Sequence, residues 1–77
     1  MNTPRHFAVC IQNSGYEGAL ELRKLYPVLE DPAAEEKSFV RVVDESGEDY
    51  LYPKDWFLPL SLPERVEEAL AQLSSVA

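Results

Sequence analysis

Hydrophobic and polar residues alternate over several short stretches of the chain, as they do in β-strands with one buried face. In the first stretch, Phe7, Val9 and Ile11 fall on one face of the predicted strand. Proline cannot donate a hydrogen bond to a sheet, so Pro27 places its strand at an edge or a bulge. We expect five short strands, at residues 6–12, 25–29, 38–43, 48–52 and 58–60.

The segments between these strands carry turn and helix signals. Residues 44–47 (DESG) predict a tight hairpin turn, with Gly47 suited to the left-handed position. Residues 54–57 predict a short 3₁₀ turn, and residues 30–37 a polar connection with one helical turn. Residues 16–22 have the composition of a short helix or a folded-back loop, and the loop is favoured because Gly15 and Gly18 bracket a span too short for a stable helix.

A helix is predicted at the C-terminal end. Ser61 and Glu64 have the spacing of a capping box, in which the two side chains bind the first free N–H groups of a helix. The helix has an apolar stripe at helical spacing, made of Val66, Ala69, Leu70 and Leu73. We expect this stripe to close the open end of the protein's own β-structure, and docking on another chain is the alternative.

Four segments follow one another in an informative order: VCIQN (9–13), ELRKLYPVLE (21–30), FVRVVD (39–44) and YPKDWF (52–57). They resemble, in this order, the A-L-Y-D-Y, E-L-S-F-x-x-G-D-x-x-x-V-L-E, W-W-x-A-R-D and I-P-S-N-Y-V segments of Src-homology-3-like (SH3-like) barrels. The resemblance implies a mainly β fold, a small SH3-like barrel of five short strands in residues 1–60. The helix at residues 61–74 would pack on it within a single domain, residues 1–77. The segment DESGEDYLYP is also similar to small bacterial proteins, a similarity that implies no function.

The same resemblance implies a binding groove. In SH3-like barrels, proline-rich ligands dock between aromatic residues of the first strand, of the tryptophan strand and of the P-S-N-Y turn. By position, Phe39, Pro53 and Trp56 would line this groove, whereas the first strand has Ile11 and Asn13 at its two aromatic positions. Two tyrosines share a face of the neighbouring strand and complete the candidate binding set: Phe39, Tyr50, Tyr52, Pro53 and Trp56.

The length of the chain indicates how many domains it forms, and its net charge indicates which classes of partner it can bind. A chain of 77 residues forms one domain, and its 45% hydrophobic residues are enough for a packed core. Seven Lys and Arg residues against fourteen Asp and Glu residues give a net charge of −7. This charge disfavours nucleic acid and anionic membranes as partners. A protein partner with a basic or proline-containing segment is expected, and association of two copies stays open.

The expected cellular compartment follows from the N-terminal residues and from the single cysteine. Residues 1–12 lack the pattern of a signal peptide, and no apolar stretch approaches the length that crosses a bilayer. Cys10 is the single cysteine, which fits a reducing compartment better than export. We therefore expect a cytoplasmic protein.

The chain offers few groups for catalysis or metal binding. Cys10 and His6 are the natural nucleophile and base, but four residues of strand separate them by about 13 Å. One His and one Cys are too few for a structural zinc site, and the acidic run at residues 44–49 lacks the spacing of a calcium loop. We expect this run to be a solvated hairpin tip. The predicted protein is not an enzyme, and neither a metal nor a cofactor is expected.

Three functions fit these observations. The first is a non-catalytic protein-interaction module that uses the aromatic set. The second is an acidic regulatory or inhibitory protein, of the antitoxin or nucleic-acid-mimic type, whose carboxylates occupy a basic site. It is motivated by four acidic pairs, Glu30-Asp31, Glu35-Glu36, Asp44-Glu45 and Glu48-Asp49. The third is an accessory subunit that docks through its C-terminal helix.

Overall fold

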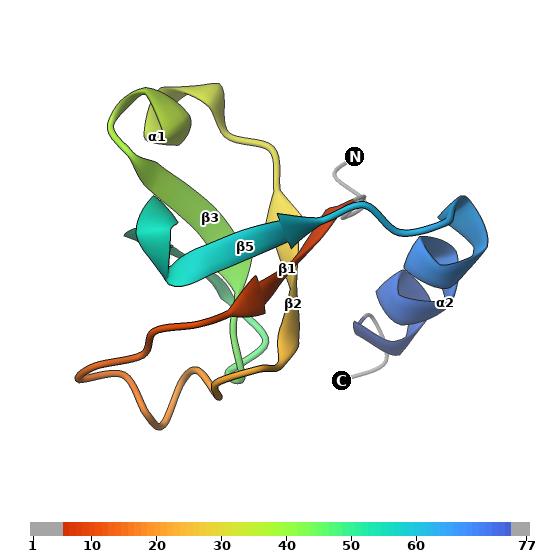
Figure 1. The fold of residues 1–77 in the computed structure, drawn as a ribbon, viewed down its shortest axis with the longest axis horizontal. Coiled ribbons are helices and arrows are strands. Elements are labelled where there is room, and N and C mark those ends of the chain that lie inside the picture. The colour runs from red at the N-terminus through yellow and green to blue at the C-terminus, as the bar shows by residue number, and fades with distance from the viewer. Residues whose placement is uncertain (1–5, 75–77) are drawn as a thin grey trace.

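Antiparallel strands make a single sheet in the computed structural model, which describes residues 6–74 (Figure 1). The predicted mainly β fold with a C-terminal helix is confirmed, because the described part holds five strands in one sheet and ends in a helix. The strands are β1 (His6–Cys10), β2 (Leu25–Leu29), β3 (Phe39–Val43), β4 (Asp49–Pro53) and β5 (Phe57–Leu60). The helices are α1 (Pro32–Glu36), the 3₁₀ turn η1 (Lys54–Trp56) and α2 (Glu64–Ser74).

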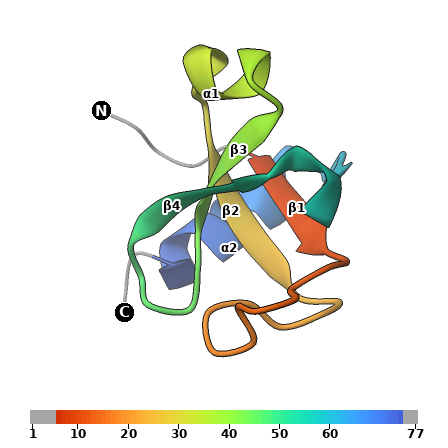
Figure 2. The same cartoon turned by 90° about the vertical axis from the view of Figure 1, so that its left-hand side faces the viewer.

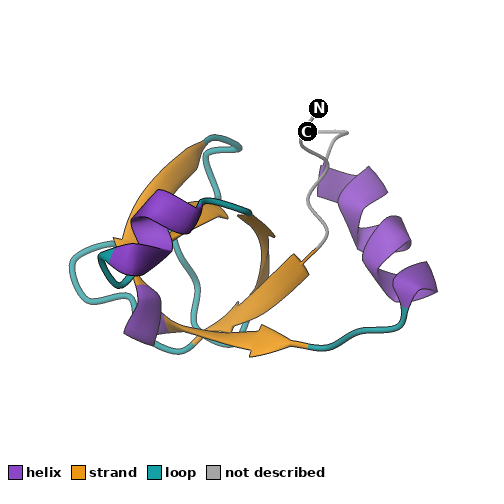
Figure 3. Ribbon diagram, turned by 90° about the horizontal axis from the view of Figure 1, so that it is seen from above, coloured by secondary structure: helices purple, strands orange, loops and turns teal. Residues whose placement is uncertain are grey.

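The strands lie side by side in the order β4-β3-β2-β1-β5, so β4 and β5 are the two edges. β2 is an inner strand, not the edge strand that Pro27 predicts, and Pro27 is tolerated because the register of β2 with β3 begins at the next residue, Val28. The sheet curls strongly, and Figure 3 shows α2 beside it on the side opposite α1. β4 passes directly through η1 into β5, yet these two strands are not paired in the described structure, so the sheet is open. Among residues 6–74, no helix is long and apolar enough to cross a membrane.

One compact core fills the inner side of the curled sheet. β1 contributes Ala8 and Cys10, and β3 contributes the fully buried Val42. Leu20 reaches the same core from the long loop at residues 11–24, which confirms the predicted loop. The aromatic part of the core is Tyr26, Tyr52 and Phe57. β3 and β4 each bury one inward-facing residue, Val42 and Tyr52, between less buried neighbours. β1 differs from its alternating pattern, because it is buried on both faces and it is Ala8 and Cys10, not the face of Phe7 and Val9, that enter this core.

α2 packs less fully than its apolar stripe predicts. Leu70 is half-buried, but Val66 and Ala69 are exposed, and Leu73 is 71% exposed. The helix is rotated so that Glu67 and Ala71 are also half-buried. Of the four residues of the predicted stripe, only Leu70 is therefore partly covered by the rest of the chain.

The predicted capping box is wrong. Neither Ser61 nor Glu64 makes a side-chain hydrogen bond among the described residues. The carbonyl of Pro63 instead accepts the N–H groups of Val66 and Glu67, at 2.9 and 3.1 Å. The first helical residue is Glu64, immediately after Pro63, so the helix begins two residues later than a serine cap at position 61 would place it.

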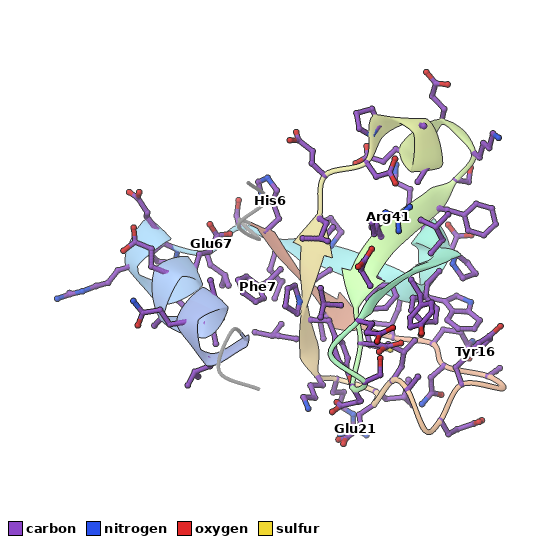
Figure 4. All side chains as sticks on the ribbon, turned by 180° about the vertical axis from the view of Figure 1, so that it is seen from behind. His6, Phe7, Tyr16, Glu21, Arg41 and Glu67 are labelled. Carbon is purple, nitrogen blue, oxygen red and sulfur yellow. The ribbon has the colours of Figure 1, made fainter. Side chains whose placement is uncertain are left out.

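Phe7 lies on the outer face of β1, away from the main core. It is buried, and Figure 4 shows its side chain between the sheet and α2. Its neighbour across the β1–β2 register is Pro27, which is also buried. The helix thus covers a small second apolar cluster.

Removal of residues 62–77 is therefore expected to destabilise the protein. Exposing Phe7 should lower the free energy of unfolding by about 1–3 kcal/mol, because roughly that much is gained when a large apolar side chain is buried. Urea denaturation measures the difference. The matched control is Leu73→Ala, which removes an exposed side chain of the same helix and should leave stability unchanged. A truncated chain as stable as the full one would contradict this packing.

Candidate binding surface

Three aromatic rings from distant parts of the sequence meet at one end of the sheet. Tyr16 comes from loop 11–24, Tyr52 from β4 and Trp56 from η1. The ring centroids of Tyr16 lie 5.6 Å from those of both Tyr52 and Trp56, in edge-to-face arrangements. Tyr52 and Trp56 are stacked at 6.2 Å. These separations are those of favourable aromatic pairs, so the three rings form one packed unit.

Of the predicted residues, Trp56 belongs to this unit, Pro53 ends β4 and Phe39 begins β3. Trp56 and Pro53 are half-buried, and Phe39 is 40% exposed. Phe39 and Pro53 are directly opposite each other in the β3–β4 register. Pro53 immediately precedes η1, so it lies between Phe39, its partner across the strands, and the turn that carries Trp56.

The two predicted tyrosines have different positions. Tyr52 is only 4% exposed and lies in the core, so it supports the other rings from beneath. Tyr50 is exposed near the β3–β4 turn, where its hydroxyl donates to Glu48 at 3.2 Å. We define the aromatic surface as Tyr16, Phe39, Pro53 and Trp56.

Tyr16 was not among the residues expected from the sequence. It is 51% exposed and lies at the far end of the molecule from α2 (Figure 4). The local signal was an aromatic residue between Gly15 and Gly18 in a polar loop. Gly15 has a φ of +84°, a left-handed conformation that lets the chain turn immediately before Tyr16.

Hydrogen bonds within loop 11–24 hold Tyr16 in place. The Tyr16 carbonyl accepts the N–H groups of Ala19 and Leu20, both at 2.9 Å. The Asn13 side-chain amide donates to the Leu20 carbonyl, also at 2.9 Å. Because Leu20 is fully buried, these bonds anchor the loop to the core. The orientation of Tyr16 is thus fixed by the fold.

A buried carboxylate supports the same rings from the β3–β4 turn. Asp44 is 6% exposed and accepts hydrogen bonds from the Tyr52 hydroxyl and from the Ser46 N–H and hydroxyl. The expectation of a solvated hairpin tip is therefore wrong for Asp44. Its carboxylate is turned inward, where the Tyr52 hydroxyl needs an acceptor.

The charge states of this pair follow from their contacts. Burial alone would raise the pKa of Asp44, but the hydrogen bonds from Ser46 and Tyr52 outweigh it and hold the pKa below its usual range. Burial, followed by the hydrogen bond to Asp44, raises the pKa of Tyr52 far above its usual value. The pair is thus an ionised carboxylate and a neutral phenol at neutral pH.

Glu45 connects the β3–β4 turn to the long loop. Its N–H donates to the Ala19 carbonyl at 3.0 Å, and its carboxylate accepts from the Tyr26 hydroxyl and pairs with Lys24. The hydrogen bond from Lys24, and then that from Tyr26, lower the pKa of Glu45. Two adjacent acids of the turn therefore bind different elements: Asp44 binds Tyr52 of β4, and Glu45 binds Tyr26 of β2 and the long loop.

Charged residues next to the aromatic surface include the exposed acids Glu17 and Asp55. Each is adjacent in sequence to a ring of the surface, Tyr16 and Trp56 respectively. The Glu17 carboxylate accepts the Gly15 N–H at 3.3 Å, which keeps it within the loop. Lys54, also exposed, follows Pro53, so these neighbours carry two negative charges and one positive charge.

Cys10 and His6 are not arranged for catalysis. Cys10 is fully buried, its thiol donates to the Gln12 carbonyl at 3.3 Å, and burial raises its pKa. A thiol whose pKa is raised is a poor nucleophile. His6 is exposed at the start of β1. Among residues 6–74, no three His, Cys, Asp or Glu side chains are grouped as metal ligands.

Comparison of the chain with protein-family models, with curated proteins and with solved structures found no match. Its function must therefore be argued from the geometry of this surface.

Tyr52→Phe tests the support beneath the surface. It removes the hydroxyl donor and leaves a buried carboxylate with one partner fewer, which should lower the free energy of unfolding by about 1–3 kcal/mol. Tyr50→Phe is the matched control, because its hydroxyl donates to an exposed glutamate on the same strand. Equal stability of the two variants in urea would show that the Asp44–Tyr52 bond stabilises nothing.

Stability should also fall in acid. The folded-state pKa values of Asp44 and Glu45 are lowered, so the unfolded chain takes up protons first as the pH decreases. We expect the free energy of unfolding to be constant from about pH 7 to about pH 5 and to fall below about pH 4. In Asp44→Asn the starting stability should be lower and the acid decline shallower. A decline as steep as that of the wild type would show that Asp44 does not contribute to it.

Proposed function

We propose that this protein is a non-catalytic protein-interaction module with an SH3-like architecture. The order of elements supports the architecture: β1, a long loop, β2, the short helix α1, β3, a tight hairpin, β4, a 3₁₀ turn and β5. The strand order β4-β3-β2-β1-β5 and the strong curl of the sheet are compatible with a small barrel. The proposal is also supported by the placing of Phe39 opposite Pro53, which directly precedes the turn that carries Trp56.

One observation carries the proposed function. Tyr16 is half-exposed and packs edge-on against Trp56, so loop 11–24 supplies an aromatic side chain although its own Ile11 and Asn13, the two expected aromatic positions, have none. The surface then has rings on both sides of Pro53 and η1. Exposed aromatic residues in fixed orientations are typical of binding sites, because they bury a large area at little cost in side-chain entropy.

The chemistry of the surface favours an extended, proline-containing segment with basic residues. Proline rings pack on aromatic faces, and a polyproline II segment is already extended before it binds. Glu17 and Asp55 at the rim would face the basic side chains, and the net charge of −7 favours their approach.

The acidic regulatory function is less well supported. Five of the eight acids in the predicted pairs have partners within the chain. Asp31 and Asp49 both bind Arg41 at 2.8 Å. In the β3–β4 turn, Glu48 accepts from Tyr50, and Asp44 and Glu45 have the partners described above. We therefore argue for the aromatic surface alone.

Peptide binding tests this proposal. An array of peptides that combine proline with lysine or arginine should retain the full-length protein, while arrays with alanine for proline or glutamate for the basic residues should not. Tyr16→Ala should weaken binding of a retained peptide at least about tenfold, as loss of a central aromatic contact does.

The chain provides a close control for this variant. Leu22 lies in the same loop and is also 51% exposed, so Leu22→Ala removes a similar exposed apolar side chain outside the surface. It should bind the peptide as tightly as the wild type. Equal losses in both variants, or no peptide retained at all, would rule out this function for the aromatic surface.

A further inference from the structure

The two edges of the sheet differ in their free backbone groups. β4 runs along the outside of the sheet, beyond β3 (Figure 2). The bonds from Asp44 N–H to the Glu48 carbonyl (3.2 Å) and from Lys54 N–H to the Ser38 carbonyl (2.9 Å) fix which residues of β4 are bonded to β3. In an antiparallel ladder every second residue is bonded, so Tyr50 and Tyr52 face β3.

The backbone groups of Asp49, Leu51 and Pro53 therefore point away from the sheet. Proline has no N–H, which leaves two donors, those of Asp49 and Leu51. Neither has a hydrogen-bond partner among residues 6–74, and both residues are exposed. Leu51 places an exposed apolar side chain in the middle of this edge.

The opposite edge has no such donors. Ile11 N–H donates to the Trp56 carbonyl at 2.8 Å, and this bond fixes which residues of β5 are bonded to β1. The backbone groups of Phe57 and Pro59 are the ones that point away from β1. The Phe57 N–H is bound to the Lys54 carbonyl, and Pro59 has none. Proteins commonly use proline in this way to prevent edge pairing. β5 is therefore closed to further strands, whereas β4 is open.

We propose that β4 pairs antiparallel with β4 of a second copy of this chain, with the two-fold axis at Leu51. Each Leu51 N–H then donates to the Leu51 carbonyl of the other copy, and each Asp49 N–H donates to the other Pro53 carbonyl. Both free N–H groups gain an acceptor. Pro53, which has no N–H, lies opposite Asp49 of the other copy and only accepts a hydrogen bond there. A symmetric pair of this kind uses the same surface on both copies.

Charge complementarity favours this register and this partner. It places Glu48 of one copy opposite Lys54 of the other, twice per dimer, and both side chains are exposed. A register centred on Tyr50 would satisfy the same N–H groups but would place Lys54 opposite Ser46. The Asp49 carboxylate is already paired with Arg41, so it adds no unpaired charge at the centre.

Sedimentation equilibrium of the full chain tests the proposal by charge reversal. The wild type should show a concentration-dependent dimer between about 10 µM and about 2 mM, the range in which a small interface dissociates. Glu48→Lys and Lys54→Glu should each weaken self-association at least tenfold, because like charges then face each other. An equimolar mixture of the two variants should dimerise again, since each mixed pair restores both opposite-charge contacts.

Two further variants separate edge pairing from general charge effects. Glu36→Lys makes the same charge change on α1, away from the edge, and should leave the dimer intact. Leu51→Pro removes a central donor without touching the β3 ladder, so the folded monomer should remain, as checked by its thermal transition. A wild type that is monomeric throughout, or a dimer unaffected by Glu48→Lys, Lys54→Glu and Leu51→Pro, would overturn the proposal.

Discussion

The hydrogen bond between the Tyr52 hydroxyl and the buried Asp44 carboxylate organises the aromatic end of the molecule. A buried carboxylate is tolerated only when its oxygens are bonded, and here Tyr52 and Ser46 supply those bonds. The bond turns the β3–β4 hairpin inward and fixes the Tyr52 ring. That ring in turn contacts Tyr16, Trp56 and Phe57.

The long loop depends on the same hairpin. Glu45 follows Asp44, and its N–H binds the Ala19 carbonyl, next to the fully buried Leu20. The 14-residue loop between β1 and β2 is thereby held at two neighbouring residues, Ala19 by its bond to the hairpin and Leu20 by its burial in the core. A surface whose rings are already in place loses little conformational entropy on binding, so this rigidity favours affinity.

Much of the fold follows from local sequence patterns. Alternation located β3 and β4, and the YPKDWF segment located η1 together with Pro53 and Trp56. Tyr16 could not be found in this way, because its role depends on how a loop folds over residues 36 and 40 positions later in the chain. The inward turn of Asp44 has the same origin: an acidic hairpin looks solvated until its neighbour across space, Tyr52, is known. The stripe of α2 shows the converse error, since helical spacing identifies an apolar face without showing what covers it.

The central claim is that Tyr16 and Trp56 form one preorganised binding surface. The most direct test is a ¹H–¹⁵N NMR titration of the full-length protein with a proline-containing basic peptide. The indole N–H of Trp56 and the amide of Tyr16 should shift together, with the same dissociation constant, while the amides of α2 stay unchanged. Shifts confined to α2 or to the β4 edge, or none at saturating peptide, would contradict the account.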